Sequence, residues 1–460
     1  MLMKNAKSVQ KDMTKGNPGK ILLEFTLPLF IGNVFQQLYN MVDSIIVGQF
    51  VSTNALAAVG STGTIMFLIT GLAFGMTTGF TILTAQRFGA GDMTGMRKTA
   101  VSSTILTGIV SIVLTLASVL FMKPLLTFMH TPEDIFDDAY RYIIVICIGL
   151  AAQMLYNLLS CLLRALGNSK MPLYFLILAA VLNIILDLVF IIAFQMGTAG
   201  AAWATVISQG ISGLLCLLYI AKAVPILHAH KEDFKLDEHM MLTQLKIGVP
   251  MALQYSITAI GSMMMQTSLN LLGSTQVAAF TAASKIEQLL TQAYVALGTA
   301  ISNYSDQNIG AGDVKRIRAG FKAATLLGFA YSTIAGAFIM TAGKYLTYLF
   351  ISENVDQLIG SVDLYLKCVG AFFYPLTIVN VYRNGIQGLG YGLLPMTAGI
   401  AELAGRGIVA MIAAHFLSYF GVCMASPTAW ILASTLLLIV YFHIIHHDLK
   451  NLTPVQKANI

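Results

Sequence analysis

Long apolar stretches alternate with short polar segments along nearly the whole chain. A helix that crosses about 30 Å of hydrocarbon needs about 20 mainly apolar residues. Twelve stretches reach that length before a polar tail begins at His446. The pattern predicts an all-α integral membrane protein with twelve transmembrane helices. The predicted spans are residues 21–47, 55–86, 99–122, 137–163, 171–194, 199–222, 242–270, 276–305, 319–343, 359–384, 393–418 and 424–445.

The composition agrees with this class of protein. Hydrophobic residues make up 57% of the chain and charged residues only 10%, against roughly 25% charged residues in a soluble domain. The first span lacks a short apolar core that ends in a small-residue cleavage motif, so we expect it to be retained in a mature chain that begins near Met1. The cysteines lie in apolar runs without CxxC spacing, and we expect them to be small core residues. They are Cys147, Cys161, Cys216, Cys368 and Cys423.

Basic residues are distributed unevenly between the loops. The formal net charge is +6, but the cations do not form one patch, so we expect no nucleic-acid partner. With twelve crossings, nearly all cations fall on one side, and the loops on the other side hold acids such as Glu133 and Asp134. By the positive-inside rule both termini are predicted to be cytoplasmic. The cations on that side are Lys4, Lys7, Lys11, Lys15, Lys20, Arg87, Arg97, Lys98, Arg164, Lys170, Lys222, Lys231, Lys235, Lys246, Lys315, Arg316, Arg318, Lys322, Lys450 and Lys457.

The two halves of the chain repeat each other at an offset of about 221 to 223 residues. Pro28 early in the first span is matched by Pro250 early in the seventh, and an LGxxxxP motif at Leu166 returns at Leu389. Six spans in each half give parallel repeats, which place a ligand site between two lobes near the membrane midplane. A GAGD loop also occurs in both halves. Its residues are Gly89, Gly91 and Asp92 in the first copy and Gly310, Gly312 and Asp313 in the second.

These observations predict how the chain is divided. Each GAGD loop is expected to be a tight turn in which Asp caps the next helix. The charged residues between the lobes are expected mainly to solvate a linker. The predicted parts are a cytoplasmic N-terminal tail (1–20), an N-lobe (21–222), a cytoplasmic linker (223–241), a C-lobe (242–445) and a cytoplasmic C-terminal tail (446–460).

Asp43 in the first span and Asp187 in the fifth interrupt apolar runs of the N-lobe. Charged residues at membrane depth face a cavity or a partner, because exposing them to lipid is costly. Positions i and i+4 share a helix face, which places Tyr39 beside Asp43 and Asn183 beside Asp187. Two acids brought together would hold a proton or bind Na⁺, and a buried hydrogen-bonded cluster is the structural alternative. The matching positions in the C-lobe are Met264 and Ala410, so the acid pair is not duplicated.

The duplicated six-span lobes, Pro28, Tyr39-x3-Asp43, the GAGD and LGxxxxP loops and Asn183-x3-Asp187 together resemble the multidrug and toxic compound extrusion (MATE) family. The likeness is greatest to its DinF-type branch and the MepA-like bacterial relatives. The resemblance implies a V-shaped pair of six-helix lobes that exports organic, often cationic, compounds in exchange for Na⁺ or H⁺. It also implies a polar network in the N-lobe, whose members are Tyr39, Asp43, Asn157, Asn183, Asp187 and Thr205.

The C-lobe carries its own embedded charges. Glu402 and Arg406 are spaced i and i+4 and are expected to form a structural ion pair. Some members of the family place a functional acid in this lobe, so the resemblance makes Glu287 and Glu402 candidates for contacting a cationic substrate. Soft and polar side chains of spans seven and eight would suit a pocket for varied ligands. The further substrate-contact candidates are Arg406, Tyr255, Met263, Gln266 and Gln288.

The sequence therefore predicts a secondary active exporter in the plasma membrane, not an enzyme, with no cofactor beyond a coupling ion. No Walker A sequence is present, and GIQGLGYG at 385–392 follows a predicted helix, so it does not fit a dinucleotide fingerprint. The expected partners are small organic compounds and the lipid bilayer, and the expected oligomeric state is a monomer. The alternative is a flippase for a lipid-linked saccharide, which would need cations for a pyrophosphate. Lys285, Lys367, Arg383 and Arg406 keep that alternative open.

Overall fold

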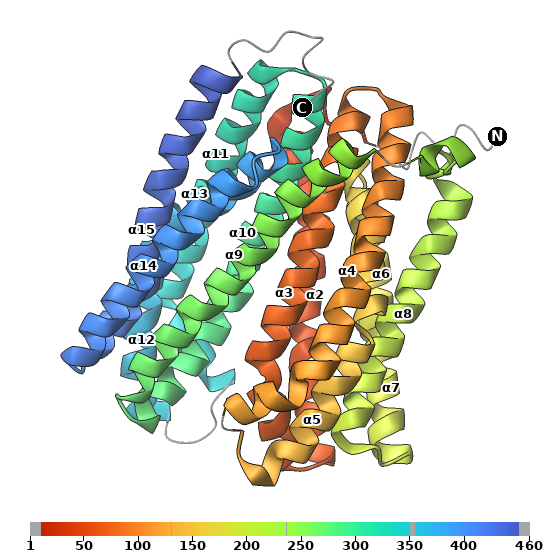
Figure 1. Cartoon of the computed structure of the whole chain (residues 1–460). Helices are drawn as coiled ribbons and strands as arrows, with labels where there is room; N and C mark the ends of the chain where they lie inside the picture. The colour runs from red at the N-terminus through yellow and green to blue at the C-terminus, as the bar shows by residue number, and fades with distance from the viewer. Residues whose placement is uncertain (1–10, 130, 236, 350–354, 450–460) are drawn as a thin grey trace. The chain divides into compact units, whose positions relative to one another are not determined.

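In the computed structural model the described residues, which are 11–129, 131–235, 237–349 and 355–449, form helices joined by turns and short loops. Parts of the two predicted tails, residues 1–10 and 450–460, lie outside that description. Figure 1 shows the long helices. Those of the first half are α2 (Pro18–Phe50), α3 (Thr53–Gly89), α4 (Met93–Phe128), α5 (Glu133–Ile148), α6 (Leu150–Ala165), α7 (Lys170–Leu188) with the π-helix η1 (Val189–Ala193), and α8 (Gly197–Ala223).

The second half repeats this order of elements. The linker between the halves holds two short 3₁₀ helices, η2 (Pro225–Leu227) and η3 (Lys231–Phe234). The later elements are α9 (Glu238–Asn270), α10 (Ser274–Gly310), α11 (Val314–Thr341), η4 (Gly343–Leu349), α12 (Val355–Ala371), α13 (Phe373–Gly388), α14 (Leu393–His415), α15 (Tyr419–His443) and η5 (Ile444–Asp448).

Each of the twelve predicted spans coincides with a helix or a bent helix pair. Among the described residues, eight helices are long and apolar enough to cross a membrane. Two further spans are pairs, α5 with α6 and α12 with α13, which bend by 46° and 51° at their junctions. The same span is thus bent in both repeats. α9 and α10 are 33 and 37 residues long, but their polar side chains keep them below the hydropathy of the others.

The chain forms two compact units. One contains Ile31–Tyr255, and the other contains Met13–Phe30 together with the chain from Ser256 onward. Both divisions fall inside helices that carry an early proline, Pro28 in α2 and Pro250 in α9. The first part of α2 thus belongs to the second unit, and the first part of α9 belongs to the first unit. The lobes predicted at 21–222 and 242–445 assign these two segments the other way round. The division into lobes at those residues stays a prediction.

Backbone contact and a buried amide attach the start of α9 to the first unit. The Gln244 side chain is fully buried and donates to the carbonyls of Phe80 at 3.0 Å and Thr99 at 3.1 Å, while Ser102 donates to Gln244 Oε1 at 2.6 Å. A Cβ on Gly79 would lie 2.4 Å from the Cα of Gly248. Since a side chain cannot fit there, glycine permits α3 and α9 to approach this closely.

The GAGD loops have the same geometry in both units. Gly91 and Gly312 have φ of 75° and 69°, in the left-handed region that glycine tolerates. Asp92 Oδ1 accepts a 2.8 Å hydrogen bond from the N–H of Gly95 at the start of α4. Asp313 Oδ1 accepts one of 3.0 Å from the N–H of Arg316 at the start of α11. Each aspartate thus satisfies a free N–H of the following helix.

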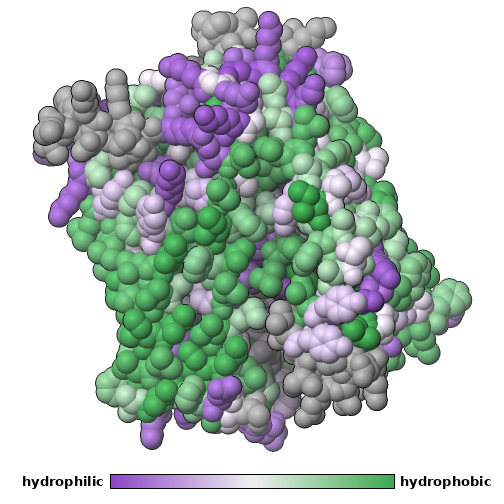
Figure 2. Space-filling model, turned by 180° about the vertical axis from the view of Figure 1, so that it is seen from behind, coloured by the Kyte–Doolittle hydropathy of each residue, from purple (hydrophilic) through white to green (hydrophobic). Residues whose placement is uncertain are grey.

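The surface and the core match a chain that lies in lipid. Hydrophobic side chains cover much of the face seen in Figure 2, and the largest group of hydrophilic ones lies at the top of the view. The side chains of Leu120, Ile334 and Ile439 are 71%, 71% and 63% exposed, which suits contact with acyl chains and not with water. All five cysteines are buried and free, as predicted for small core residues.

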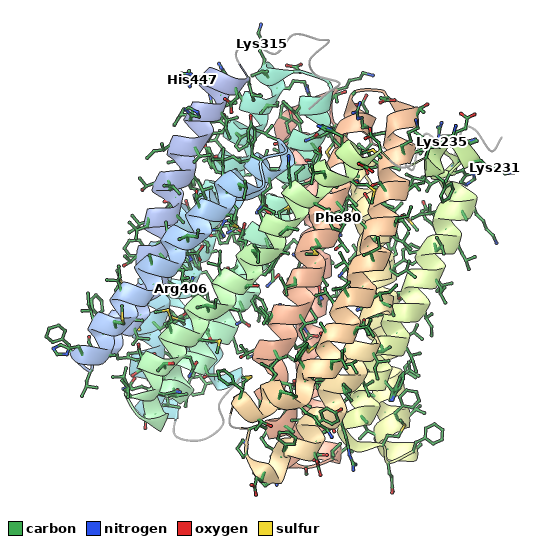
Figure 3. The ribbon with its side chains drawn as sticks, viewed as in Figure 1. Phe80, Lys231, Lys235, Lys315, Arg406 and His447 are labelled. Atoms are coloured by element: carbon green, nitrogen blue, oxygen red, sulfur yellow. The ribbon has the colours of Figure 1, made fainter. Side chains whose placement is uncertain are left out.

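The linker is not fully solvated. Most of its charged side chains are exposed, including Lys231 and Lys235, which are labelled in Figure 3. Asp233 is instead 2% exposed and pairs with Arg97 of α4 at 3.2 Å. The expectation that the linker charges mainly contact water is wrong for this residue, because an ion pair with a helix of the first unit compensates its burial.

Candidate functional site

Two acids from different helices meet inside the first unit. Asp43 on α2 and Asp187 near the end of α7 are 8% and 0% exposed, and their carboxyl groups lie against each other. As carboxylates they can only accept hydrogen bonds. Asp43 Oδ1 and both oxygens of Asp187 have no donor among the described residues. Two such groups in contact repel unless a proton or a cation lies between them.

An amide and a hydroxyl extend this acidic pair. Asn183 lies one turn before Asp187 on α7 and is 1% exposed. Its Nδ2 donates to Thr205 Oγ1 of α8 at 3.3 Å, while its Oδ1 has no donor among the described residues. Oxygen atoms of carboxylate, amide and hydroxyl groups suit a hard cation such as Na⁺. Asn183, which shares a helix face with Asp187, thus connects α7 beside the acid pair to Thr205 of α8.

Three further polar side chains lie near the acids or contact a neighbour of theirs, and the sequence did not indicate two of them. Tyr39 and Tyr142 both lie close enough to the acid pair to interact with it electrostatically. Gln209 of α8 makes a hydrogen-bond contact with Tyr39. Tyr142 and Gln209 are polar residues inside predicted spans, and this position is the feature of the sequence that could have indicated them. Asn157 on α6 is half-buried and adds no contact to this cluster within the described parts of the chain.

The second unit holds a network of ion pairs. Glu402 on α14 accepts hydrogen bonds from Arg383 of α13 at 2.6 Å and from Arg406 at 2.9 Å. The predicted pairing of Glu402 with Arg406 is confirmed. Figure 3 labels Arg406. Arg383 is a partner that sequence spacing could not indicate, because it comes from another helix. A carboxylate bound by two guanidinium groups is strongly stabilised in its charged form.

A second acid completes this network. Glu287 Oε2 of α10 accepts a 2.5 Å hydrogen bond from Tyr365 of α12, and Glu287 also interacts electrostatically with Arg406. At the repeat offset, Tyr365 corresponds to Tyr142 and Arg406 to Asn183. The two units therefore have polar centres at matching places. The first is acidic without a fixed counter-charge, and the second contains its own guanidinium.

The other substrate-contact candidates do not form one cluster within the described residues of either unit. Met263, Gln266 and Gln288 are exposed in the second unit, and Gln266 Nε2 donates to Asn270 Oδ1 at 2.8 Å. Tyr255 lies at the end of the first unit, where its ring contacts the edges of Phe67 and Phe74. Their contact with a substrate stays a prediction.

The repeated helices and the embedded acids are typical of a membrane transporter built from two six-span repeats. Comparison with known proteins supports this class. The MatE family model matches residues 28–189 and again 250–412, once in each half of the chain. The chain belongs to the MATE family, and it is a transporter and not an enzyme.

Three relatives illustrate the match. The chain is 33% identical over 375 residues to the probable multidrug resistance protein YpnP of Bacillus subtilis, covering 82% of this chain and 83% of that protein. It is 21% identical over 453 residues to the multidrug export protein MepA of Staphylococcus haemolyticus, covering 96% of each. A solved outward-facing structure of a multidrug resistance MATE family transporter superposes with a TM-score of 0.90 at 25% identity, covering 96% of this chain and 98% of that one. The twelve-helix, two-lobe fold of the family is therefore the fold of this chain.

Proposed function

We propose that the chain exports organic, often cationic, compounds by exchange for Na⁺ or H⁺, and that the coupling ion binds at Asp43, Asp187 and Asn183. The observation that supports this most directly is the buried contact of the two acids, in which three carboxylate oxygens have no donor among the described residues. A structural cluster would supply donors to those oxygens. An ion site leaves them to the ion.

The ion would act by changing the charge of the acid pair. When a proton or Na⁺ neutralises the repulsion, α2 and α7 can pack closely through Asp43 and Asp187; when it leaves, the two helices repel at that point. This change would bias two lobes, residues 21–222 and 242–445, between inward-open and outward-open states. The energy of the ion gradient would thereby drive export.

The donor set of the proposed site accommodates either ion. The acids alone are sufficient to hold a proton, with Tyr39 nearby. Asn183 Oδ1 and Thr205 Oγ1 add neutral oxygens of the kind that Na⁺ takes as ligands, and Asn157 would have to move toward the pair to contribute. The ion is therefore assigned by experiment, with one gradient imposed at a time.

A flippase for a lipid-linked saccharide is the weaker candidate. It would need cations that are free to hold a pyrophosphate, whereas Arg383 and Arg406 are bound to Glu402 and Lys367 is bound to Asp363 at 2.6 Å. Lys285 is exposed, but a single cation is a poor match for a group with several negative charges. The neutralised network of the second unit favours an exporter.

The proposed setting is the plasma membrane, with both termini in the cytoplasm and the chain acting as a monomer. The positive-inside distribution of lysine and arginine supports that orientation. The names of YpnP and MepA agree with a role in drug resistance.

The test is transport of a fluorescent cationic dye such as ethidium in everted vesicles that contain the chain. We expect dye movement under an imposed Na⁺ gradient or an imposed pH gradient, and the gradient that suffices identifies the ion. Vesicles without the chain are the control. If neither gradient moves any member of a broad panel of dyes, the exporter assignment is wrong.

A further inference from the structure

The second unit contains a buried acid outside its ion-pair network. Asp306 lies near the end of α10, four residues before Gly310, and is 3% exposed. Its Oδ1 has no hydrogen-bond partner in the described parts of the chain, and neither does Oγ of the adjacent Ser305, which is fully buried. A buried polar atom without a partner is uncommon in proteins and requires a physical explanation, of which a bound proton is one.

The charged groups on the neighbouring elements are engaged elsewhere. Arg383 of α13 binds Glu402, and Lys367 of α12 binds Asp363. Arg316 of α11 binds Asn308 Oδ1 at 3.0 Å and the carbonyl of Met13 at 3.0 Å. The remaining basic residues at the start of α11, Lys315, Arg318 and Lys322, are exposed. Tyr304, one turn before Asn308, donates to the carbonyl of Arg316.

The structure makes room for this carboxyl group on the facing helix. The position of a Cβ on Gly388, at the end of α13, is 2.9 Å from Asp306 Oδ1 and 2.5 Å from the carbonyl oxygen of Ser302. Both oxygens therefore face the backbone of α13 at the same point, and any larger residue than glycine would collide with them.

The first repeat lacks both features at the matching positions. At the repeat offset, Asp306 corresponds to Ala85 and Gly388 to Ala165, and both alanines are buried, at 1% and 2% exposure. The first repeat thus packs two methyl groups where the second places an acid against a glycine. The larger side chain of Asp306 is thus matched by the smaller residue Gly388 on the facing helix. This match indicates that the packing of the second repeat is adapted to the carboxyl group.

We propose that Asp306 is a proton-binding site of the second repeat. An ionised carboxylate in this buried place would have neither a counter-charge nor a donor, which is highly unfavourable. A protonated carboxyl group has an O–H that can donate to a nearby oxygen such as the Ser302 carbonyl. The oxygen set is too small for a metal ion, and the described residues contain no cluster of three metal-ligating side chains. Uptake of the proton therefore accompanies close packing of α13 on α10, and its release accompanies their separation.

The site is independent of the proposed exchange at Asp43 and Asp187, and it is tested without transport. Infrared difference spectra of the full chain in lipid vesicles, recorded between neutral and alkaline pH, report the carbonyl stretch of a protonated carboxyl group. The background is the Asp43→Asn/Asp187→Asn variant, so that the first unit does not contribute. We expect a carboxylic acid band that is lost completely in Asp306→Asn. If Asp306→Asn has the same difference spectrum as its parent, Asp306 neither takes up nor releases a proton in this range, and the proposal is wrong.

Two further arms separate the remaining explanations. Addition of Na⁺ at fixed pH should leave the band unchanged, and its disappearance would mean that the site binds a metal ion instead of a proton. Gly388→Ala should shift or remove the band, because the added methyl group presses on the carboxyl group. Gly360→Ala is the matched control, since nothing lies within 4 Å of a Cβ there. An unchanged band in Gly388→Ala would contradict the link between the proton and the packing of α13.

Discussion

Arg383 on α13 and Glu402 on α14 form a 2.6 Å ion pair between two helices of the second unit. The side chains of Arg383 and Glu402 are only 12% and 9% exposed, and Arg406 binds the other carboxylate oxygen from within α14. Pairs buried to this degree contribute through the cost of separating them, because the remaining charge has no other partner.

Glu402→Gln should therefore destabilise the protein by about 3 kcal/mol, since it leaves the buried guanidinium group of Arg383 without a counter-charge and removes that of Arg406 from its nearest carboxylate. The measurement is the midpoint of thermal unfolding in detergent. Asp363→Asn is the control, because its partner Lys367 is 54% exposed and exposed pairs contribute only about 0.5 kcal/mol. Equal, small effects of the two substitutions would mean that the Glu402 network does not stabilise the second unit.

Asp43→Asn and Asp187→Asn should each abolish dye export driven by an ion gradient while the protein remains folded and inserted. Either substitution removes one of the two charges that the coupling ion neutralises. Without the repulsion between the two carboxylates, loss of the ion no longer separates α2 from α7. Export is measured in everted vesicles, and insertion is checked by the yield of folded protein. Asp363→Asn serves again as the control. Undiminished transport in both variants would contradict the proposed ion site.

Gly79→Ala should destabilise the first unit by about 2 kcal/mol, because the added methyl group would force the backbones of α3 and α9 apart. Gly60→Ala in the same helix is the matched control, since a Cβ there meets nothing within 4 Å. In that open position alanine should be neutral or slightly stabilising. Thermal unfolding of the purified variants measures both effects, and the expectation fails if the two glycines respond alike.

The linker should detach from α4 at low pH. Burial tends to raise the pKa of Asp233, but the His230 N–H, which donates at 2.8 Å, and the guanidinium group of Arg97 outweigh it and lower the pKa below 3.8. Because the pKa of Asp233 is lower when the linker is docked than when it is free, its carboxylate stabilises docking at a pH above the pKa of the free group. This stabilisation is lost as the pH falls through the pKa of the docked state.

Limited proteolysis of the linker at a series of pH values measures this docking. We expect slow cleavage near neutral pH and faster cleavage below about pH 4. Asp233→Asn should be cleaved quickly at every pH, whereas Asp237→Asn, at an exposed position of the same linker, should behave like the parent. A pH dependence that survives in Asp233→Asn would assign the effect to another group.

Hydropathy and repetition were enough to predict the fold. Hydrocarbon accepts only apolar spans of a fixed length, so Leu120 or Ile334 identifies a lipid-facing helix without knowledge of its neighbours. Repeated loops such as the one at Gly91 and Gly312 identified two copies, because a turn with positive φ needs glycine at a fixed place. No such local signal predicts the bend between α5 and α6. None predicts that the first part of α2 belongs to the second unit and the first part of α9 to the first.

The sequence also identified the embedded acids Asp43 and Asp187, since an Asp in an apolar run is conspicuous, and the helical period placed Asn183 beside Asp187. Only the tertiary structure decided which groups from separate helices touch: Asp43 with Asp187, Arg383 with Glu402, and Asp306 with the backbone at Gly388. Such contacts depend on the distance and rotation between packed helices. Those are set by the fit of many side chains at once, and no repeat or period along a single helix encodes them.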